Sequence, residues 1–256
     1  MTNHSREDAL TDRQLELLLE GARELPEPHD FEARAVIMIA GRLGLRGGEI
    51  AHLRADWIDE DRRMIDIPEY DPCEKGKNGG VCGYCRERAK DRVDAHNLSH
   101  DEARDIVQEE FGEADLADDQ LDTLAEQKRS EHNMALESAL DERWEPKTEN
   151  GARSIPYDLD ARTEIVIERF ADRYDIFPKA RIAVNRRVNE AVAAAGLEGR
   201  IYPHALRATA ANQMAMNDVS AHSLLAIFGW SDIETARAYI KASEENAARE
   251  IRSKCR

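Results

Sequence analysis

The chain has 256 residues, 41% of them hydrophobic, which is enough for one large or two small globular domains. It contains no uninterrupted apolar run long enough to span a membrane, and its opening is too highly charged for a signal peptide, so we expect a cytoplasmic protein with no membrane partner. The formal net charge of −16 argues against a protein that holds nucleic acid by overall charge alone, because like charges repel the phosphate backbone.

The first predicted elements are helices. Thr11, followed three residues later by Gln14, has the pattern of a capping box, and a stripe of leucines comes after it. Residues 31–44 (FEARAVIMIAGRLG) predict a second, largely buried helix, and residues 46–54 (RGGEIAHLR) predict a short third one. The alternation of apolar and polar residues over 57–68 (WIDEDRRMIDIP) then predicts a β-hairpin or the first part of a small sheet.

Residues 69–143 differ in character from the sequence on either side and predict an insertion or small subdomain. The stretch begins with a cysteine cluster and continues with acidic helical sequence over 101–111 and 120–140. Most of the acidic excess of the chain lies here, whereas residues 144–256 are almost neutral. A local positive groove outside the insertion is therefore compatible with the acidic chain.

Residues 144–157 (WEPKTENGARSIPY) return to β structure, with two strands around a turn at Asn150 and Gly151. The remaining sequence predicts helices over 159–175, 180–195, 204–216, 220–228 and 232–241, followed by a charged tail from Ser243. The predicted fold class is α+β and mainly α, with helices around a small antiparallel sheet and a partly helical insertion. We expect one domain, residues 1–256, interrupted by the insertion at 69–143.

Four segments in chain order carry candidate functional residues. They read RLGLRGGEIAHLRADWID, then WEPKTENGARSIPY, HALRATAANQM and IFGWSDIETARAYIK. Taken singly, Arg46, His204 and Tyr239 could each be an ordinary helix-end or surface residue. Together and in this order, the segments resemble the signatures of the tyrosine recombinase (phage integrase) family, over residues 31–68 and 144–241.

The resemblance implies the family's catalytic fold and the activity of a site-specific DNA recombinase or integrase. Such an enzyme cleaves and rejoins DNA strands through a 3′-phosphotyrosine intermediate, and it needs no cofactor for catalysis. Trp230 lies nine residues before Tyr239, as the family's second histidine or tryptophan does before its nucleophile. By the matching motifs, the implied catalytic residues are Arg46, Lys147, His204, Arg207, Trp230 and the nucleophile Tyr239.

The two arginines suit the chemistry of a phosphodiester. In the transition state the negative charge spreads over the nonbridging oxygens, and a guanidinium group can donate paired hydrogen bonds to them while staying charged near neutral pH. Arg46 and Arg207 fit this role. Arg207 also lies in the first turn of its predicted helix, where backbone N–H groups and the helix dipole favour an anion.

The nucleophile and the leaving group each need a proton partner. A phenol with an ordinary pKa of about 10 is a weak nucleophile until a base takes its proton, and His204 would serve Tyr239 in this way. The departing 5′ oxygen needs a proton in return. By the resemblance, Lys147 in the PKTENGAR turn would deliver it.

Two further residues would support the site. Trp230 could donate its indole N–H to a phosphate oxygen while its ring packs behind the nucleophile. Glu49 lies one helical turn from Arg46 and is suited to holding a catalytic residue in place. The alternative for Glu49 is a simple surface ion pair with Arg46, which by itself contributes little.

The insertion contains Cys73, Cys82 and Cys85 in a C-x8-C-x2-C pattern, within a chain of four cysteines. These are too few for a disulfide framework and suit a tetrahedral structural zinc site, for which His96 or His100 could supply the fourth ligand. The alternative is a cluster of reduced thiols. A catalytic metal is not expected.

Arg46 follows only 45 residues, so we expect no separate N-terminal core-binding domain of the kind that most family members carry. A basic patch beside the cysteines could partly replace it by contacting backbone phosphates, or it could be a charged face balanced by acidic neighbours. The patch comprises Lys75, Lys77, Arg86, Arg88, Lys90 and Arg92.

The expected partners are a double-stranded DNA recombination site, further copies of the chain in a homo-tetramer on DNA, and an accessory DNA-binding factor. The tail after Tyr239 would dock on a neighbouring subunit or close its own core. Two alternatives remain for the function. One is a type IB-like topoisomerase that uses the same chemistry, and the other is a non-catalytic accessory or regulatory DNA-binding protein with the same fold.

The basic residues are mostly arginine, 28 of the 36. An acid-rich, lysine-poor surface is typical of proteins that work in concentrated salt, so we expect a halophilic source such as a haloarchaeon or its virus; the alternative is an ordinary solvated acidic surface. In molar salt the release of counterions contributes little to DNA affinity. Binding would then depend on hydrogen bonds and fit.

Overall fold

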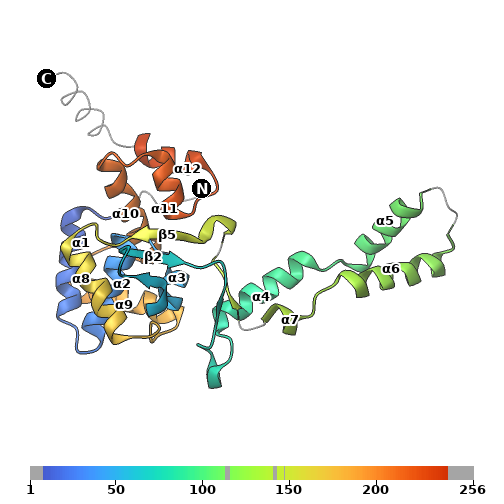
Figure 1. Cartoon of the computed structure of the whole chain (residues 1–256), viewed down its shortest axis with the longest axis horizontal. Helices are drawn as coiled ribbons and strands as arrows, with labels where there is room; N and C mark the ends of the chain where they lie inside the picture. Colours follow the sequence, from blue (N-terminus) through green and yellow to red (C-terminus); the bar gives the residue numbers. More distant parts are fainter. Residues whose placement is uncertain (1–7, 113–115, 141–142, 147, 242–256) are drawn as a thin grey trace. The chain divides into compact units, whose positions relative to one another are not determined.

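The structure is a computed structural model, and it describes residues 8–112, 116–140, 143–146 and 148–241. The chain divides into two compact units (Figure 1). The first unit comprises Met1–Asp71 and Glu145–Arg256, and the second is Pro72–Trp144. The boundaries expected for the insertion, 69 and 143, lie close to the ends of the second unit. Among the described residues, no helix has the length and apolar character that crossing a membrane requires.

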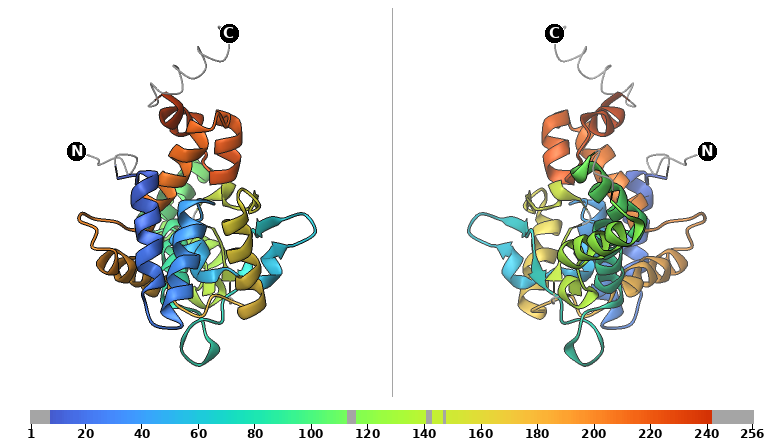
Figure 2. Two further views of the ribbon diagram at one scale, coloured as in Figure 1. Left: turned by 90° about the vertical axis from the view of Figure 1, so that its left-hand side faces the viewer. Right: turned by 90° about the vertical axis from the view of Figure 1, so that its right-hand side faces the viewer.

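The first unit begins with α1 (Asp12–Arg23), α2 (His29–Gly41) and α3 (Gly47–His52). The predicted capping box of α1 is confirmed, because Thr11 and Gln14 each bond the other's backbone N–H. Helix α2 is buried along almost its whole length and packs against α1, α9 and α10. Figure 2 shows α1 and α2, both blue, side by side.

A small antiparallel sheet has the strand order β1-β2-β5, with β1 (Ile58–Asp59), β2 (Met64–Ile67) and β5 (Arg153–Pro156). The short 3₁₀ turn η1 (Ala55–Trp57) precedes β1. The hairpin predicted over 57–68 is confirmed, since Ile58 pairs with Ile65. Ile65 pairs in turn with Ile155 of β5, and both side chains are fully buried.

The predicted pairing of two strands within residues 144–157 is wrong. Strand β4 (Arg143–Trp144) pairs with β3 (Asp71–Pro72) in a separate two-stranded sheet, and β5 pairs with β2. Among the residues described between β4 and β5, the one regular element is the 3₁₀ turn η3 (Glu149–Gly151). The physical reason is burial, because Ile155 gains an apolar partner opposite Ile65 that a local hairpin would not offer.

The helices predicted in the C-terminal part are all present. They are α8 (Ala161–Arg173), α9 (Arg181–Ala194), α10 (Pro203–Met216), α11 (Ala221–Phe228) and α12 (Ile233–Lys241). Asp160 and Ser220 cap α8 and α11 by accepting backbone hydrogen bonds. Helices α10, α11 and α12 share a hydrophobic cluster that includes Phe228 and Tyr239. The charged tail from Ser243 lies outside the described residues.

The second unit contains the 3₁₀ turn η2 (Lys77–Gly79) and α4 (Gly83–His96), α5 (His100–Phe111), α6 (Asp118–His132) and α7 (Leu136–Leu140). Helix α4 was not predicted, because its polar and charged residues give almost no apolar stripe. The helix predicted over 120–140 is interrupted at Asn133. The side chain of Asn133 bonds the backbone N–H and carbonyl of Leu98, which competes with continued helix.

Candidate active site

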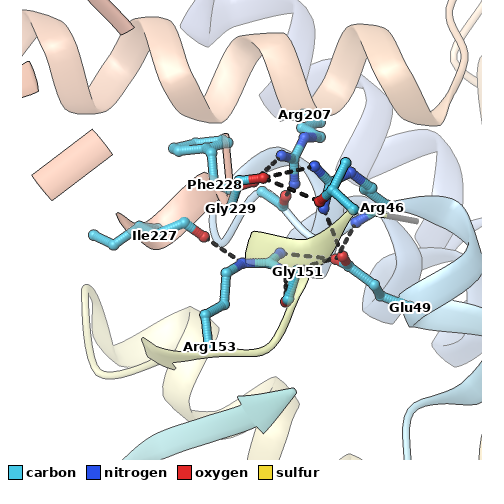
Figure 3. Close-up of polar contacts among 10 residues, drawn as sticks. Arg46, Glu49, Gly151, Arg153, Arg207, Ile227, Phe228 and Gly229 are labelled. Atoms are coloured by element: carbon cyan, nitrogen blue, oxygen red, sulfur yellow. Dashed lines mark hydrogen bonds and ion pairs between the residues drawn. The ribbon is translucent and has the colours of Figure 1, made fainter. Parts of the chain in front are cut away.

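Three arginines meet at the C-terminal end of α11, where helix carbonyls have no partner within the helix (Figure 3). Arg153 donates from Nε to the Ile227 carbonyl at 2.6 Å. Arg207 donates from Nη2 to the next carbonyl, that of Phe228. Arg46 donates from Nη2 to the Gly229 carbonyl at 3.1 Å. Three successive carbonyl groups thus bring together guanidinium groups from three distant parts of the sequence.

Glu49 lies at the centre of this group and is 1% exposed. Its carboxylate accepts hydrogen bonds from Arg46 Nη1 at 3.0 Å and from the Arg46 backbone N–H at 2.7 Å. Arg153 donates to both carboxylate oxygens, at 2.9 and 2.8 Å. Burial raises the pKa of Glu49, but the charge and hydrogen bonds of Arg153, with the charges of Arg207 and Arg46, outweigh it and lower the pKa from 4.5 to about 2.

Arg207 is more deeply buried than Arg46, the other predicted arginine, and 3% of its surface is exposed. It donates to the carbonyl groups of Gly44 and Phe228, and its guanidinium lies over the Phe228 ring, 5.0 Å from the centroid. Burial and then the charge of Arg46 lower the pKa of Arg207 well below its ordinary value, whereas Glu49 raises it. Arg46 and Arg153 bond the single carboxylate of Glu49, and Arg207 adds a third positive charge, so an anion bound there would be stabilised.

Two glycines allow this close packing. Gly44 has φ of +74°, and a Cβ atom there would lie 2.4 Å from Cε1 of Phe228. Gly229 has φ of +55°, and a Cβ atom there would lie 2.5 Å from the Asn150 carbonyl oxygen. Any other residue at either position would therefore strain the backbone and push the arginine-binding carbonyls away.

A stack of aromatic rings connects the cluster with α12. The rings of Phe228 and Trp230 lie 4.8 Å apart with an interplanar angle of 19°. The rings of Trp230 and Tyr239 lie 5.2 Å apart at 10°. Tyr239 is 9% exposed and belongs to the shared core of α10, α11 and α12. The predicted nucleophile is thus held beside the helix end that binds the arginines.

The remaining predicted residues are placed less fully. His204 is exposed and lies in the first turn of α10, on the same helix as Arg207. Lys147 lies outside the described residues. The next residue, Thr148, bonds the Gly229 carbonyl from its hydroxyl at 3.3 Å, so this turn reaches the same helix end as Arg46.

Sequence analysis did not single out Arg153. The signal was an arginine at the start of an apolar strand, within a segment already quoted as a signature. From the sequence alone, Arg153 could equally be a solvent-exposed residue at the end of a strand. Its burial and its bonds to Glu49 distinguish it from such a surface arginine.

A second cluster contains Cys73, Cys82 and Cys85, all buried and all in the second unit. Their sulfur atoms lie within 4.8 Å of one another, so the group could supply three ligands of a structural metal ion. The backbone N–H groups of Cys82 and Cys85 donate to the sulfurs of Cys73 and Cys82, each at 3.5 Å.

Two histidines were predicted as candidates for the fourth ligand. His96 bonds the His132 carbonyl from Nε2 at 3.1 Å, and its ring stacks on that of His132 at the far end of α4 from Cys85. His100 lies at the start of α5, where its Nε2 is 3.7 Å from Asp122. Both histidines thus contact other groups of the second unit, and the fourth ligand stays a prediction.

A model of the phage integrase family matches residues 8–246. The chain belongs to the phage integrase family. No curated protein matches the chain. Family membership accounts for the order of the four segments and for the mainly helical α+β fold with its three-stranded antiparallel sheet.

Solved structures of the same fold have low sequence identity to this chain. The XerA recombinase is 12% identical with a TM-score of 0.54, and the match covers 96% of this chain and 64% of that one. The Tn1549 transposon integrase in complex with a circular intermediate DNA is 16% identical with a TM-score of 0.57, covering 96% and 65%. The same integrase in complex with transposon right end DNA is likewise 16% identical to this chain, with a TM-score of 0.57. The chain thus spans slightly under two thirds of the XerA and Tn1549 chains.

Proposed function

We propose that this member of the phage integrase family is a site-specific DNA recombinase, an integrase that cleaves and rejoins DNA strands through a 3′-phosphotyrosine. The observation that carries the proposal is the convergence of Arg46 and Arg207 on successive carbonyls of one helix end, with Tyr239 stacked beside it through Trp230. A DNA-binding module needs neither this excess of buried positive charge nor a buried tyrosine next to it.

The arginine cluster would bind the scissile phosphate. Arg46 and Arg207 would donate to its nonbridging oxygens, where charge accumulates during displacement at phosphorus. The anion would also favour the charged form of Arg207, whose pKa is lowered by burial and by Arg46. Trp230 would add one donor, its indole N–H.

The covalent step would transfer the phosphoryl group to Tyr239. A bond forms between Tyr239 Oη and phosphorus, and the bond from phosphorus to the 5′ oxygen breaks. His204 takes the phenol proton, and Lys147 gives a proton to the 5′ oxygen, so a 5′-hydroxyl leaves. Attack by a 5′-hydroxyl of the partner duplex reverses the step and releases the tyrosine. The energy of the original bond is retained, and this chemistry requires no ATP or catalytic metal.

The proposed partners follow from this reaction. The substrate would be double-stranded DNA with a recombination site, and exchange between two duplexes calls for four active sites, hence a homo-tetramer on DNA. An accessory DNA-binding factor would assist site recognition. The reaction would take place in the cytoplasm of the cell that hosts a mobile element or virus. The acidic surface suits a halophilic host.

The test is capture of a covalent adduct. Nicked duplex DNA from the region flanking the gene loses its 5′-hydroxyl fragment after cleavage, which traps the 3′-phosphotyrosine on a denaturing gel, in low and in molar salt. We expect an adduct with the native chain and with Tyr70→Phe, whose side chain is exposed, and none with Tyr239→Phe, which should still bind DNA. An adduct that persists in Tyr239→Phe, or DNA binding by the native chain without any adduct, would contradict the proposal and favour the accessory-protein alternative.

We further propose that Cys73, Cys82 and Cys85 hold a structural zinc ion, with His96 or His100 as the candidate fourth ligand. Three thiolates suit tetrahedral zinc, and the cysteines are buried with backbone N–H groups directed at two of the sulfurs. Zinc bound in this way would order the loop that carries Cys73 and Cys82 and would take no part in the phosphoryl transfer.

Metal content and cobalt spectroscopy test the zinc proposal. We expect one zinc ion per chain, and a cobalt-loaded protein with the absorption bands of tetrahedral thiolate ligation. Cys82→Ser should weaken or shift these bands, whereas Cys255→Ser, which replaces the fourth cysteine of the chain, should leave them unchanged. Unchanged bands in Cys82→Ser, or a reduced protein that binds neither metal, would contradict the assignment.

A further inference from the structure

Arg153 connects three structural elements through a single guanidinium group (Figure 3). Nε donates to the Ile227 carbonyl at the end of α11. Nη1 donates to Glu49 Oε1 and to the Gly151 carbonyl at 2.6 Å, and Nη2 donates to Glu49 Oε2. The side chain is 5% exposed and that of Glu49 is 2% exposed, so the bonds are made out of contact with bulk water.

From this geometry we infer that Arg153 is a positioning residue for the arginine pair of the proposed active site. The inference rests on the proposed function, because it concerns how Arg46 is oriented for the scissile phosphate. Arg153 itself would not touch DNA. It would act by fixing the carboxylate of Glu49, which in turn fixes Arg46.

The connection to Arg46 is made through shared acceptor atoms. Glu49 Oε1 accepts from both Arg46 Nη1 and Arg153 Nη1, and Oε2 accepts from the Arg46 backbone N–H and from Arg153 Nη2. Because Arg153 engages both oxygens, the carboxylate cannot rotate without breaking two charge-assisted bonds. The second Nη of Arg46 bonds the Gly229 carbonyl, two residues beyond the one that Arg153 holds. Arg153 therefore holds both groups that orient Arg46, the Glu49 carboxylate and the C-terminal end of α11.

Lysine cannot replace this function. An ammonium group is a single point charge, whereas the fork of Arg153 directs its N–H groups to acceptors on three elements at once. Lysine preserves the charge that Glu49 requires, so it tests geometry separately from charge. We expect the native orientation of Arg46 to be lost in Arg153→Lys while the fold is kept.

The experiment measures single-turnover adduct formation and DNA affinity for Arg153→Lys and Arg153→Gln. The matched control is Arg162→Lys, because Arg162 is 48% exposed and pairs with Glu16 on the surface of the same unit. We expect the adduct to form about 10- to 100-fold more slowly in the Arg153 variants, with DNA affinity within a few fold of the native value, since small displacements of a catalytic group cost this much in rate. If Arg153→Gln does not fold, Arg153→Lys carries the test.

A substrate with an uncharged scissile linkage separates positioning from general damage. In a methylphosphonate one nonbridging oxygen is replaced by a methyl group, so less charge develops for Arg46 to stabilise. We expect the deficit of Arg153→Lys to shrink on this substrate, as that of Arg46→Lys should, and the two deficits to combine less than additively in the double variant.

Three results would overturn the inference while the proposed function stands. These are native rates in both Arg153 variants, an equal deficit on the charged and uncharged substrates, and full additivity with Arg46→Lys. Failure of the native chain to form any adduct would instead overturn the proposed function. The two failures are therefore distinguishable in one set of reactions.

Discussion

In the first unit, Glu49 and Arg153 form an ion pair with side-chain exposures of only 2% and 5%, whereas in the second unit Arg104 pairs with Asp118 and Asp122, whose side chains are 95% and 49% exposed. The cores differ in the same sense. The first unit buries large side chains such as Phe170 and Phe177. The second buries mostly alanine and cysteine, with few larger residues.

The comparison separates buried charges, which belong to the proposed active site, from exposed charges, which face solvent. A buried pair is costly to desolvate and is retained where its geometry matters, while an exposed pair contributes little beyond solubility. A unit with a small apolar core needs another source of stability, and zinc bound by the cysteine cluster, as proposed, would provide one. The two regions should therefore respond differently to the same kinds of change.

The largest effect is expected from removing the metal ligands of the second unit. Cys85→Ser, or a chelator added to the native protein, should abolish hydrogen-exchange protection in α4, because structural zinc contributes on the order of 10 kcal/mol in zinc-finger peptides. Helices α2 and α10 in the first unit should stay protected. Unchanged protection of α4 in metal-free protein would show that its small core is sufficient by itself.

Glu49→Gln should destabilise the first unit by about 3 to 5 kcal/mol at neutral pH, because it leaves buried guanidinium groups without their anion. The pH dependence provides a second measurement. The pKa of Glu49 is lowered from 4.5 to about 2, so its stabilising effect is complete above pH 4.5 and is lost as the pH falls toward 2. Acid titrations of unfolding should show this loss in the native chain and not in Glu49→Gln; parallel curves would contradict it.

Gly44→Ala should cost about 2 to 3 kcal/mol, since it combines a positive φ of +74° with a Cβ atom 2.4 Å from the Phe228 ring. Gly196→Ala is the matched control. Gly196 has a φ of +61° but nothing within 4 Å of the added atom, so only the backbone term of about 1 kcal/mol applies. Chemical denaturation of both variants should show the difference, and equal losses would mean that Phe228 can move aside.

The smallest effect is expected at Arg104 of the second unit. Arg104→Ala removes ion pairs with Asp118 and Asp122, yet the exposure of these groups limits the loss to at most about 1 kcal/mol, and less in high salt. Thermal unfolding at low and molar salt measures it. A loss as large as that of Glu49→Gln would end the distinction between the two kinds of charge.

The sequence predicted the helices of the first unit because their signals are local. Thr11 and Gln14 lie within one helical turn, and the caps at Asp160 and Ser220 precede their own helices. Strand pairing was predicted less well. A strand's partner is chosen by the burial it gains, and for Ile155 that partner is ninety residues away at Ile65.

Arg153 was not among the residues predicted for the site, because an arginine at a strand end has an ordinary explanation until its burial is known. The sequence gives the separation of Arg153 and Glu49 along the chain but not their distance in space.

The sequence by itself determined the order and identity of the signature residues, since Arg46, Arg207, Trp230 and Tyr239 are read directly from motifs that are each complete within a few residues. Only the tertiary structure decided what surrounds them. Carbonyl groups at the end of α11 orient the arginines, and a carboxylate shared with Arg153 holds one of them. These contacts join residues from 21 to 183 positions apart, and they depend on packing, burial and hydrogen-bond direction, which no local pattern encodes.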